Sequence, residues 1–172
     1  DTFHPVNRLD RGVTGVMVVA KNGYMHQRCM AILHTDDFRR EYRGICDGVP
    51  QPTQGTVDLP ISRQPGSLLK RSIDPEGLPS RTEYEVLSVS HGRALLRLRP
   101  ITGRTHQLRL HMAAIGHPLT GDWLYGAEDK TLIARPALHS YELWLRHPIS
   151  GAHIHVTAPL PEDMAQLIKE DI

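Results

Sequence analysis

The spacing of apolar and polar positions predicts strands along much of the chain. Residues 16–20 (VMVVA) form a continuous apolar run rich in β-branched side chains, which predicts a buried strand. Residues 39–47 alternate instead, with Tyr42 on one face and Glu41 on the other, and this predicts a strand of modest burial. Two later pairs of segments predict hairpins, one around His91-Gly92 and one around Pro148–Gly151; they are residues 82–89 with 93–99 and residues 137–146 with 153–158.

Three segments have helical patterns, at about residues 23–34, 106–115 and 162–169. Asn22 is the expected N-cap of the first helix and Thr105 of the second, because their side-chain oxygens can accept hydrogen bonds from the free N–H groups of a first turn. Gly116 is the expected residue just after the second helix, with Pro118 beyond it. Strands joined by hairpins, with a few interspersed helices, predict an α+β fold on a mixed, mainly antiparallel β-sheet with flanking helices.

The segment 48–80 is rich in Pro, Gly and Ser and holds one strand candidate, near residues 56–61. The rest of it is expected to be a long surface loop, and such loops are often functional or mobile. The chain has no internal repeat and no low-complexity segment. We therefore expect residues 1–172 to form a single domain.

Composition fits one folded domain outside the membrane. The chain has 172 residues, of which 40% are hydrophobic, and a domain of this size needs no covalent cross-links. Cys29 and Cys46 form no C-x-x-C pair, so we expect free thiols in a reducing compartment. No apolar run approaches the ~20 residues of a membrane span, and we expect no signal peptide at Asp1. We expect a cytoplasmic monomer without membrane contact.

Bulk charge does not identify a partner, because the formal net charge is only +1. The distribution of the charges is more informative. Basic side chains gather in four groups: Arg8 and Arg11; Arg39, Arg40 and Arg43; Lys70 and Arg71; and Arg93, Arg97, Arg99, Arg104 and Arg109. These groups fit a nucleic-acid surface, although a solvated surface explains any one of them equally well.

The first segment with chemical potential is NRLDRGVTG, residues 7–15. Asp10 stands between Arg8 and Arg11, just ahead of a predicted buried strand. Nearby positive charge favours an ionised carboxylate, and an ionised carboxylate at the edge of an apolar core can act as a nucleophile. An ordinary turn or surface salt-bridge aspartate explains the same pattern more simply.

The second segment is residues 103–126, GRTHQLRLHMAAIGHPLTGDWLYG. Gly103 and Arg104 lead into a predicted helix whose first turns hold His106, Gln107 and Arg109. The N–H groups and dipole of a helix start favour anions, and Arg109 adds a forked donor for a carboxylate or phosphate. A core helix with polar residues on its wet face is the alternative interpretation.

Together these segments resemble the RluA-like family of RNA pseudouridine synthases. The family's first motif is approximately H-R-L-D-x-x-T-S-G, and here it reads N-R-L-D-R-G-V-T-G. Its later motif, T-G-R-x-H-Q-[IL]-R-x-H followed by G-H-P and G-D-x-x-Y-G, is matched within residues 102–126. A basic-x-Tyr strand motif is matched by Arg40-Glu41-Tyr42, and the TEYEV stretch at residues 82–86 is also typical. The resemblance runs nearly end to end and implies the pseudouridine synthase catalytic fold.

The resemblance also implies roles for individual residues. Asp10 would be the catalytic nucleophile, Tyr42 would lie against the target base and assist proton transfer, and Arg109 would pair with Asp10 and order the site. Arg8 would help to displace the target nucleotide from the RNA. The residues expected to contact the substrate are Arg8, Arg11, Arg40, Arg104, His106, Gln107 and Leu108, the last as apolar packing beside Asp10.

This sequence departs from the family pattern in a few places. Asn7 stands where the family has His, a change that would alter how the RNA backbone is held; Val13-Thr14 replaces Thr-Ser; and Arg40 replaces Lys. None of these changes removes a group that the chemistry needs. Family members also carry an upstream N-K-P-x-G segment and often a further RNA-binding domain, so we expect this chain to be N-terminally truncated.

The implied reaction is the isomerisation of uridine to pseudouridine in structured ribosomal or transfer RNA. It moves no electrons in or out, so no cofactor and no metal is expected. Two other classes stay open. A metal hydrolase is suggested by eleven histidines, but His106 and His111 are five residues apart, and His153 and His155, which share a strand face, lack an obvious carboxylate partner. The other is an RNA-binding module that has lost catalysis.

Overall fold

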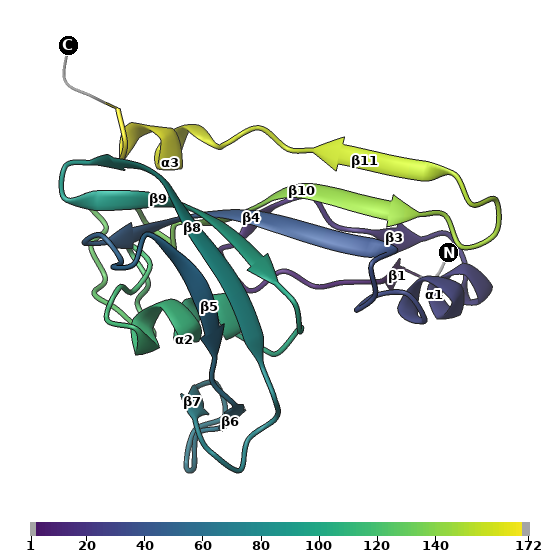
Figure 1. The fold of residues 1–172 in the computed structure, drawn as a ribbon, viewed down its shortest axis with the longest axis horizontal. Helices are drawn as coiled ribbons and strands as arrows, with labels where there is room; N and C mark the ends of the chain where they lie inside the picture. The colour runs from purple at the N-terminus through teal and green to yellow at the C-terminus, as the bar shows by residue number, and fades with distance from the viewer. Residues whose placement is uncertain (1–2, 170–172) are drawn as a thin grey trace.

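The computed structural model describes residues 3–169, and its framework is a seven-stranded sheet. Figure 1 shows α2 beneath this sheet and α3 above it. In spatial order the sheet contains β11 (His153–Thr157), β10 (Leu138–Arg146), β4 (Phe38–Asp47), β9 (Arg93–Pro100), β8 (Arg81–Ser90) and β5 (Gln54–Asp58), with β2 (Thr14–Gly15) paired to β10. Two small ladders join β1 (His4–Pro5) to β3 (Val19–Ala20) and β6 (Ile61–Arg63) to β7 (Arg71–Ile73). The helices are α1 (Gly23–Met30), α2 (Gln107–Ala114) and α3 (Glu162–Gln166).

Strand pairing confirms the mixed, mainly antiparallel sheet. Every pair is antiparallel except β2 with β10, in which Thr14 lies opposite His139. The β8–β9 hairpin turns at His91 and Gly92, as predicted, with φ of 50° and 72°. Two successive positive φ angles are typical of a type I′ turn, which matches the twist of the flanking strands.

Strand β4 is more buried than its alternating sequence predicts. Tyr42 and Cys46 pack on the α2 side with Leu98 of β9. Ile45 belongs to the opposite cluster, which includes Met164 of α3. Successive strand residues point to opposite faces, so a strand with a helix over each face is buried on both. The expectation of modest burial was therefore wrong, because the covering helices are remote in sequence.

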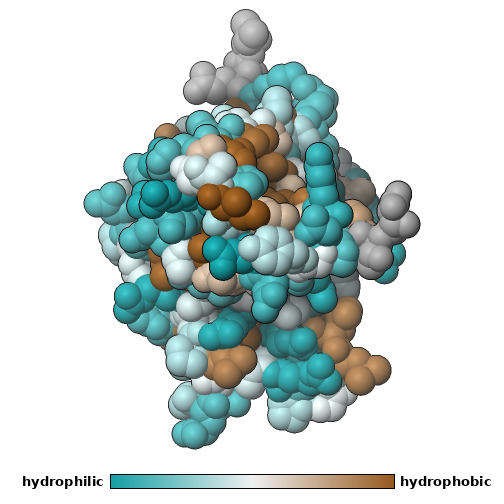
Figure 2. All heavy atoms as spheres, turned by 90° about the vertical axis from the view of Figure 1, so that its right-hand side faces the viewer, coloured by the Kyte–Doolittle hydropathy of each residue, from teal (hydrophilic) through white to brown (hydrophobic). Residues whose placement is uncertain are grey.

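The apolar run 16–20 does not form one strand. Only Val19 and Ala20 are in a ladder, and Val16 is tied to the main sheet by a 2.9 Å bond from its N–H to the Ser140 carbonyl. The run is apolar because Val16 and Val18 cover a second core cluster beneath β10. This cluster lies toward the α1 end of the molecule, where Figure 2 shows apolar side chains interspersed with hydrophilic ones.

The helices are shorter than predicted. Asn22 caps α1 as expected, with its Oδ1 accepting from the Met25 N–H at 2.9 Å, but α1 ends at Met30. The residue that caps α2 is His106 and not Thr105; it has a left-handed φ of 58° and no capping side-chain bond. The predicted end of α2 is confirmed: Gly116 has φ of 86°, and the His117 N–H bonds to the Met112 carbonyl, as in a Schellman motif. Helix α3 ends at Gln166.

The segment 48–80 contains three strands, where the sequence indicated one. Strand β5 joins the sheet edge, and β6 and β7 form a separate hairpin that projects away from the sheet in Figure 1. The sequences of β6 and β7, ISR and RSI, are too short to show a strand period.

Gly15 is expected to be irreplaceable at the β2–β10 contact. A Cβ at this position would lie 2.1 Å from the Ser140 carbonyl oxygen, and φ is +117°. Gly15→Ala should cost at least about 1–3 kcal/mol of folding free energy from the strained backbone alone, with the clash added. Gly66→Ala is the matched control, because Gly66 also has positive φ but a Cβ added there would meet nothing within 4 Å. Equal falls in melting temperature for the two variants would contradict this role of Gly15.

Candidate active site

A small pocket of about 90 Å³ lies between the N-terminal segment, β4 and the start of α2. Its size is far below the roughly 300–1,000 Å³ of a site for a drug-sized ligand, so a single flat ring is the natural occupant. Seven of the ten residues chosen from the sequence line it: Arg8, Asp10, Arg40, Tyr42, Arg104, Gln107 and Leu108. The other three, Arg11, His106 and Arg109, do not.

Asp10 enters this pocket from the turn between β1 and β2, where its carbonyl accepts a 3.0 Å bond from the Val13 N–H. Its side chain is half-buried. Within residues 3–169 no ion pair or hydrogen bond to the Asp10 carboxylate is found, and the exposed Arg8 and Arg11 do not bridge to it. The carboxylate is thus held at the pocket wall with its oxygens available to a ligand.

Tyr42 reaches the same pocket from the centre of the sheet and is 6% exposed. Burial raises the pKa of its hydroxyl, and the nearby Arg40 and Ser140 only partly oppose this shift. The hydroxyl therefore keeps its proton at neutral pH. Leu108 from α2 adds an apolar side chain to a pocket that polar groups line as well.

Arg109 has a different partner from the one expected. Its Nε and Nη2 donate to the two oxygens of Asp122 at 2.8 and 2.7 Å, and both side chains are essentially inaccessible. The prediction that Arg109 is hydrogen-bonded to Asp10 is wrong for this structure. Asp10 acts on Arg109 only at longer range, as a weaker contribution than Asp122 to its raised pKa. The physical reason is that α2 directs Arg109 toward the turn 121–126.

Asp122 is the functional candidate that the sequence reasoning missed. Besides Arg109, its Oδ1 accepts from the N–H groups of Leu124 and Tyr125, at 2.9 and 3.2 Å. The available signal was the Gly-Asp-x-x-Tyr-Gly sequence, because an aspartate that bonds the backbone two residues on is typical of a turn. Asp122 thereby fixes both α2 and the turn that follows it.

Gln107 and His106 make hydrogen bonds within the protein. The Gln107 oxygen accepts from Thr102 Oγ1 and from the Arg104 N–H, and its Nε2 donates to the Arg81 carbonyl and Thr82 Oγ1. These four bonds use the whole capacity of the amide, so Gln107 shapes the wall and has no hydrogen bond left for a substrate. His106 lies outside the pocket, with its Nδ1 2.8 Å from the Tyr125 hydroxyl.

Asn7 also has a structural role. It is 4% exposed, and its Oδ1 accepts a 2.8 Å bond from the Val18 N–H. The side chain therefore ties two parts of the N-terminal segment together. The expected effect of the His-to-Asn departure on how the RNA backbone is held stays a prediction.

Further findings concern metal binding, membrane spans and the cysteines. Within residues 3–169, no three His, Cys, Asp or Glu side chains come together in a way that would hold a metal ion. His155, for which the sequence suggested no carboxylate partner, lies 3.5 Å from Glu142 and stacks on Trp144. The described helices also include none with the length and apolar character to cross a membrane. Cys29 and Cys46 are free, buried thiols, as expected, and burial raises the pKa of Cys46 to about 12.

Comparisons with known proteins agree with the family that the sequence motifs resemble. A family model described as RNA pseudouridylate synthase matches residues 1–114. An uncharacterized RNA pseudouridine synthase, YjbO of Bacillus subtilis, is 40% identical over 98% of this chain and 59% of its own length. The ribosomal large subunit pseudouridine synthase D of Escherichia coli is 41% identical over 95% of this chain and 54% of its own. The chain thus spans a little over half the length of these curated relatives.

Solved structures agree with the sequence comparison. Human RNA pseudouridylate synthase domain containing 1 has a TM-score of 0.77 and 27% identity, covering 92% of this chain and 69% of that protein's chain. Human RNA pseudouridylate synthase domain containing 4 gives 0.76 and 28%, covering 96% and 74%. Fold, motifs and relatives coincide, and the chain belongs to the RNA pseudouridylate synthase family, of the RluA-like kind that its motifs indicate.

Proposed function

We propose that this chain isomerises specific uridines of a structured RNA to pseudouridine, with Asp10 as the nucleophile. The observation that carries the proposal is the Asp10 carboxylate, which has no ion-pair partner among residues 3–169 and stands on the wall of a base-sized pocket beside the buried Tyr42. A carboxylate with free oxygens in a partly dry site is suited to covalent catalysis. The base must leave its stack to enter, which costs a few kcal/mol in a duplex.

The reaction needs little beyond these groups. The bond from N1 of uracil to C1′ breaks, a bond from C5 to C1′ forms, the hydrogen of C5 leaves as a proton, and N1 gains a proton. Asp10 attacks either C1′ of the ribose or C6 of the ring, and the proposal holds for both routes. Tyr42 lies against the base and assists the proton transfer from C5.

Arg109 is proposed to act through position and not by touching Asp10. Its buried ion pair with Asp122 ties α2 to the turn 121–126, and α2 carries Leu108 into the pocket. Asp10 is near enough to contribute to the raised pKa of Arg109, after the hydrogen bond and charge of Asp122. Arg109 is therefore a positioning residue in this proposal, whereas Asp10 and Tyr42 are the catalytic ones.

The substrate class is ribosomal or transfer RNA, and we propose that the chain works as a single-domain, metal-free cytoplasmic monomer. The name of the Escherichia coli relative refers to the large ribosomal subunit, which favours ribosomal RNA. A mass-based map of pseudouridines in cells lacking the protein tests this. Loss of one or a few sites from large-subunit ribosomal RNA is expected. An unchanged map would favour the alternative of an RNA-binding module without catalysis.

Arg8 is proposed to stabilise the flipped state of the RNA. It is exposed at the rim of the Asp10 pocket, and a planar guanidinium can stack on bases and bond to phosphates in the gap that the uridine leaves. Arg8→Ala should lower turnover roughly 10- to 100-fold on a duplex-embedded uridine, because the few kcal/mol of unstacking are no longer offset. On a short unpaired RNA the loss should be much smaller. Equal losses on both RNAs, with a lower melting temperature, would instead give Arg8 a role in folding.

A further inference from the structure

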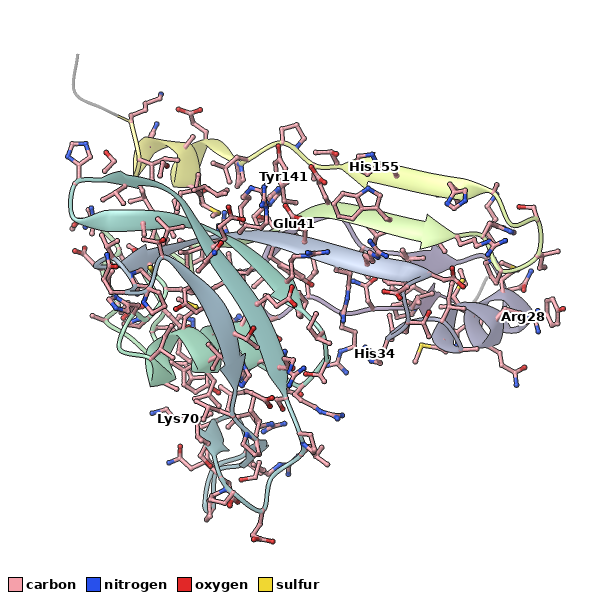
Figure 3. The ribbon with its side chains drawn as sticks, viewed as in Figure 1. Arg28, His34, Glu41, Lys70, Tyr141 and His155 are labelled. Atoms are coloured by element: carbon pink, nitrogen blue, oxygen red, sulfur yellow. The ribbon has the colours of Figure 1, made fainter. Side chains whose placement is uncertain are left out.

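Three basic side chains from three elements meet beside the active-site pocket. They are His34 from the loop after α1, Arg40 from β4 and Arg104 from the loop before α2. A Cβ on Gly103 would lie 2.7 Å from the His34 Cε1 and 3.5 Å from the Arg40 Nη2, so both side chains lie close to the same glycine of this loop. The positive charges of Arg40 and Arg104 contribute, after burial, to the lowered pKa of His34. Figure 3 shows His34 beneath β4.

These three side chains have almost no partners in the protein. Within the described part of the chain, Arg40 and His34 make no side-chain hydrogen bond or ion pair. The guanidinium of Arg104 makes one hydrogen bond there, from its Nε to the Pro79 carbonyl at 3.2 Å. The neighbouring carboxylates are engaged elsewhere, Asp36 by Arg39 at 3.5 Å and Glu83 by Arg99 at 3.7 Å.

Arg40 is the least expected of the three. It is half-buried, and loss of solvent lowers its pKa. Removing a guanidinium from water is unfavourable unless an acceptor replaces the water. The only carboxylate among the residues that line the pocket is Asp10, and it forms no ion pair with Arg40. The arrangement is thus suited to an anion that is not part of this chain.

The position of the three basic side chains indicates which anion they would bind. Arg40 and Arg104 line the Asp10 pocket, whereas Arg40 and His34 also line the larger adjoining hollow that runs along the ends of β4 and β9. A nucleotide whose base occupies the first pocket must continue its sugar–phosphate chain outward. We propose that His34, Arg40 and Arg104 bind one backbone phosphate of the RNA strand next to the target uridine. This inference rests on the proposed function.

Such a contact would set the register of the strand. Phosphate contacts carry no sequence information, but they fix where the backbone lies. A phosphate held at the mouth of the pocket limits how the adjoining nucleotide can be placed over Asp10. The cluster would therefore contribute affinity for any RNA strand, while the choice of the uridine depends on other surfaces.

Salt-dependent binding of a fluorescein-labelled uridine decanucleotide to the 172-residue chain tests the site. Four variants are compared with the wild type. They are Arg40→Gln, Arg104→Gln, the double variant that carries both of these changes, and His34→Gln. The logarithm of the binding constant falls linearly with the logarithm of the salt concentration. Loss of one phosphate contact to a single strand should make this slope shallower by about 0.7. Because all three residues hold the same phosphate, the double variant should lose little more than either single variant.

Arg28→Gln is the matched control, because Arg28 lies on the exposed surface of α1 and apart from His34 in Figure 3. Its slope should be that of the wild type, and melting curves should show that all variants fold. His34→Gln should weaken binding several-fold. Additive slope losses, unchanged slopes in the Arg40 and Arg104 variants, or no salt-dependent binding by the wild type would each overturn the phosphate site.

Failure of this site and failure of the proposed function are distinguishable. Conversion of uridine to pseudouridine in a transcript of ribosomal RNA is measured on the same protein preparations. Pseudouridine formation with unchanged binding slopes refutes only the phosphate site. If the variants show the expected decrease in salt dependence but the wild type forms no pseudouridine, only the catalytic proposal is refuted. The protein would then have an RNA-binding surface without catalysis.

Discussion

Asp10→Asn is expected to abolish turnover while leaving the fold and RNA affinity intact. The amide keeps the shape of the side chain but lacks the negative charge of the nucleophile. Because the Asp10 carboxylate makes no ion pair or hydrogen bond within residues 3–169, its loss removes no contact that stabilises the protein. The rate should fall by at least about 10⁴-fold, the scale seen when a covalent nucleophile is removed. Single-turnover kinetics on a uridine-containing transcript measures this.

The same preparation provides the controls. The melting temperature of Asp10→Asn should be within about 2 °C of the wild type, since a substitution that keeps the side-chain shape and breaks no hydrogen bond or ion pair should cost under about 0.5 kcal/mol. Its RNA affinity should be unchanged within a factor of about three. Near-normal turnover would exclude Asp10 as the nucleophile. A large fall in melting temperature would instead indicate that Asp10 is a structural residue.

Asp122→Ala should be among the most destabilising substitutions in the chain. It leaves the guanidinium of Arg109 buried without a partner and removes the acceptor for the Leu124 and Tyr125 N–H groups. Breaking one side of a buried ion pair costs about 3–5 kcal/mol. For a chain of this size that corresponds to a fall of roughly 6–20 °C in melting temperature, which calorimetry measures.

Asp58→Ala is a closely matched control for that substitution. The Arg81–Asp58 pair also has two hydrogen bonds from Nε and Nη2, although both go to one oxygen, Asp58 Oδ2, at 3.1 and 2.6 Å. Both of its side chains are 55% exposed, and an exposed pair contributes only about 0–1 kcal/mol. A cost for Asp122→Ala as small as that for Asp58→Ala would contradict the role given to the buried pair.

The sequence predicted the elements whose turns or ends are determined by residues within the element itself. The β8–β9 hairpin was recoverable because His91-Gly92 can adopt the two positive φ angles that the turn needs. The end of α2 at Gly116 was recoverable for a similar reason. The double-sided burial of β4 and the parallel β2–β10 pair were not, because both depend on residues that are more than about 60 positions away.

The site was likewise predicted only in part: its residues could be chosen from motifs, but their mutual contacts could not. Motif matching selected Asp10 and Tyr42, which the fold brings to one pocket. It assigned Arg109 to Asp10 because the motif names residues but not their mutual distances. Only the course of α2 shows that Asp122, 13 residues away, takes both of the guanidinium bonds. His34 belongs to no motif, and its place beside Arg40 arises from the loop that the α1–β4 connection happens to form.

The most direct test of the central claim follows the hydrogen that the isomerisation must release. RNA containing uridine tritiated at C5 is incubated with the wild-type chain and with Asp10→Asn, and tritium in water, pseudouridine in the RNA and free uracil are counted together. Because rejoining through C5 displaces its hydrogen, we predict one tritium released for each pseudouridine formed by the wild type. We also predict no free uracil, and no release with Asp10→Asn. Free uracil in place of pseudouridine, or equal release by both proteins, would contradict an aspartate-dependent isomerase.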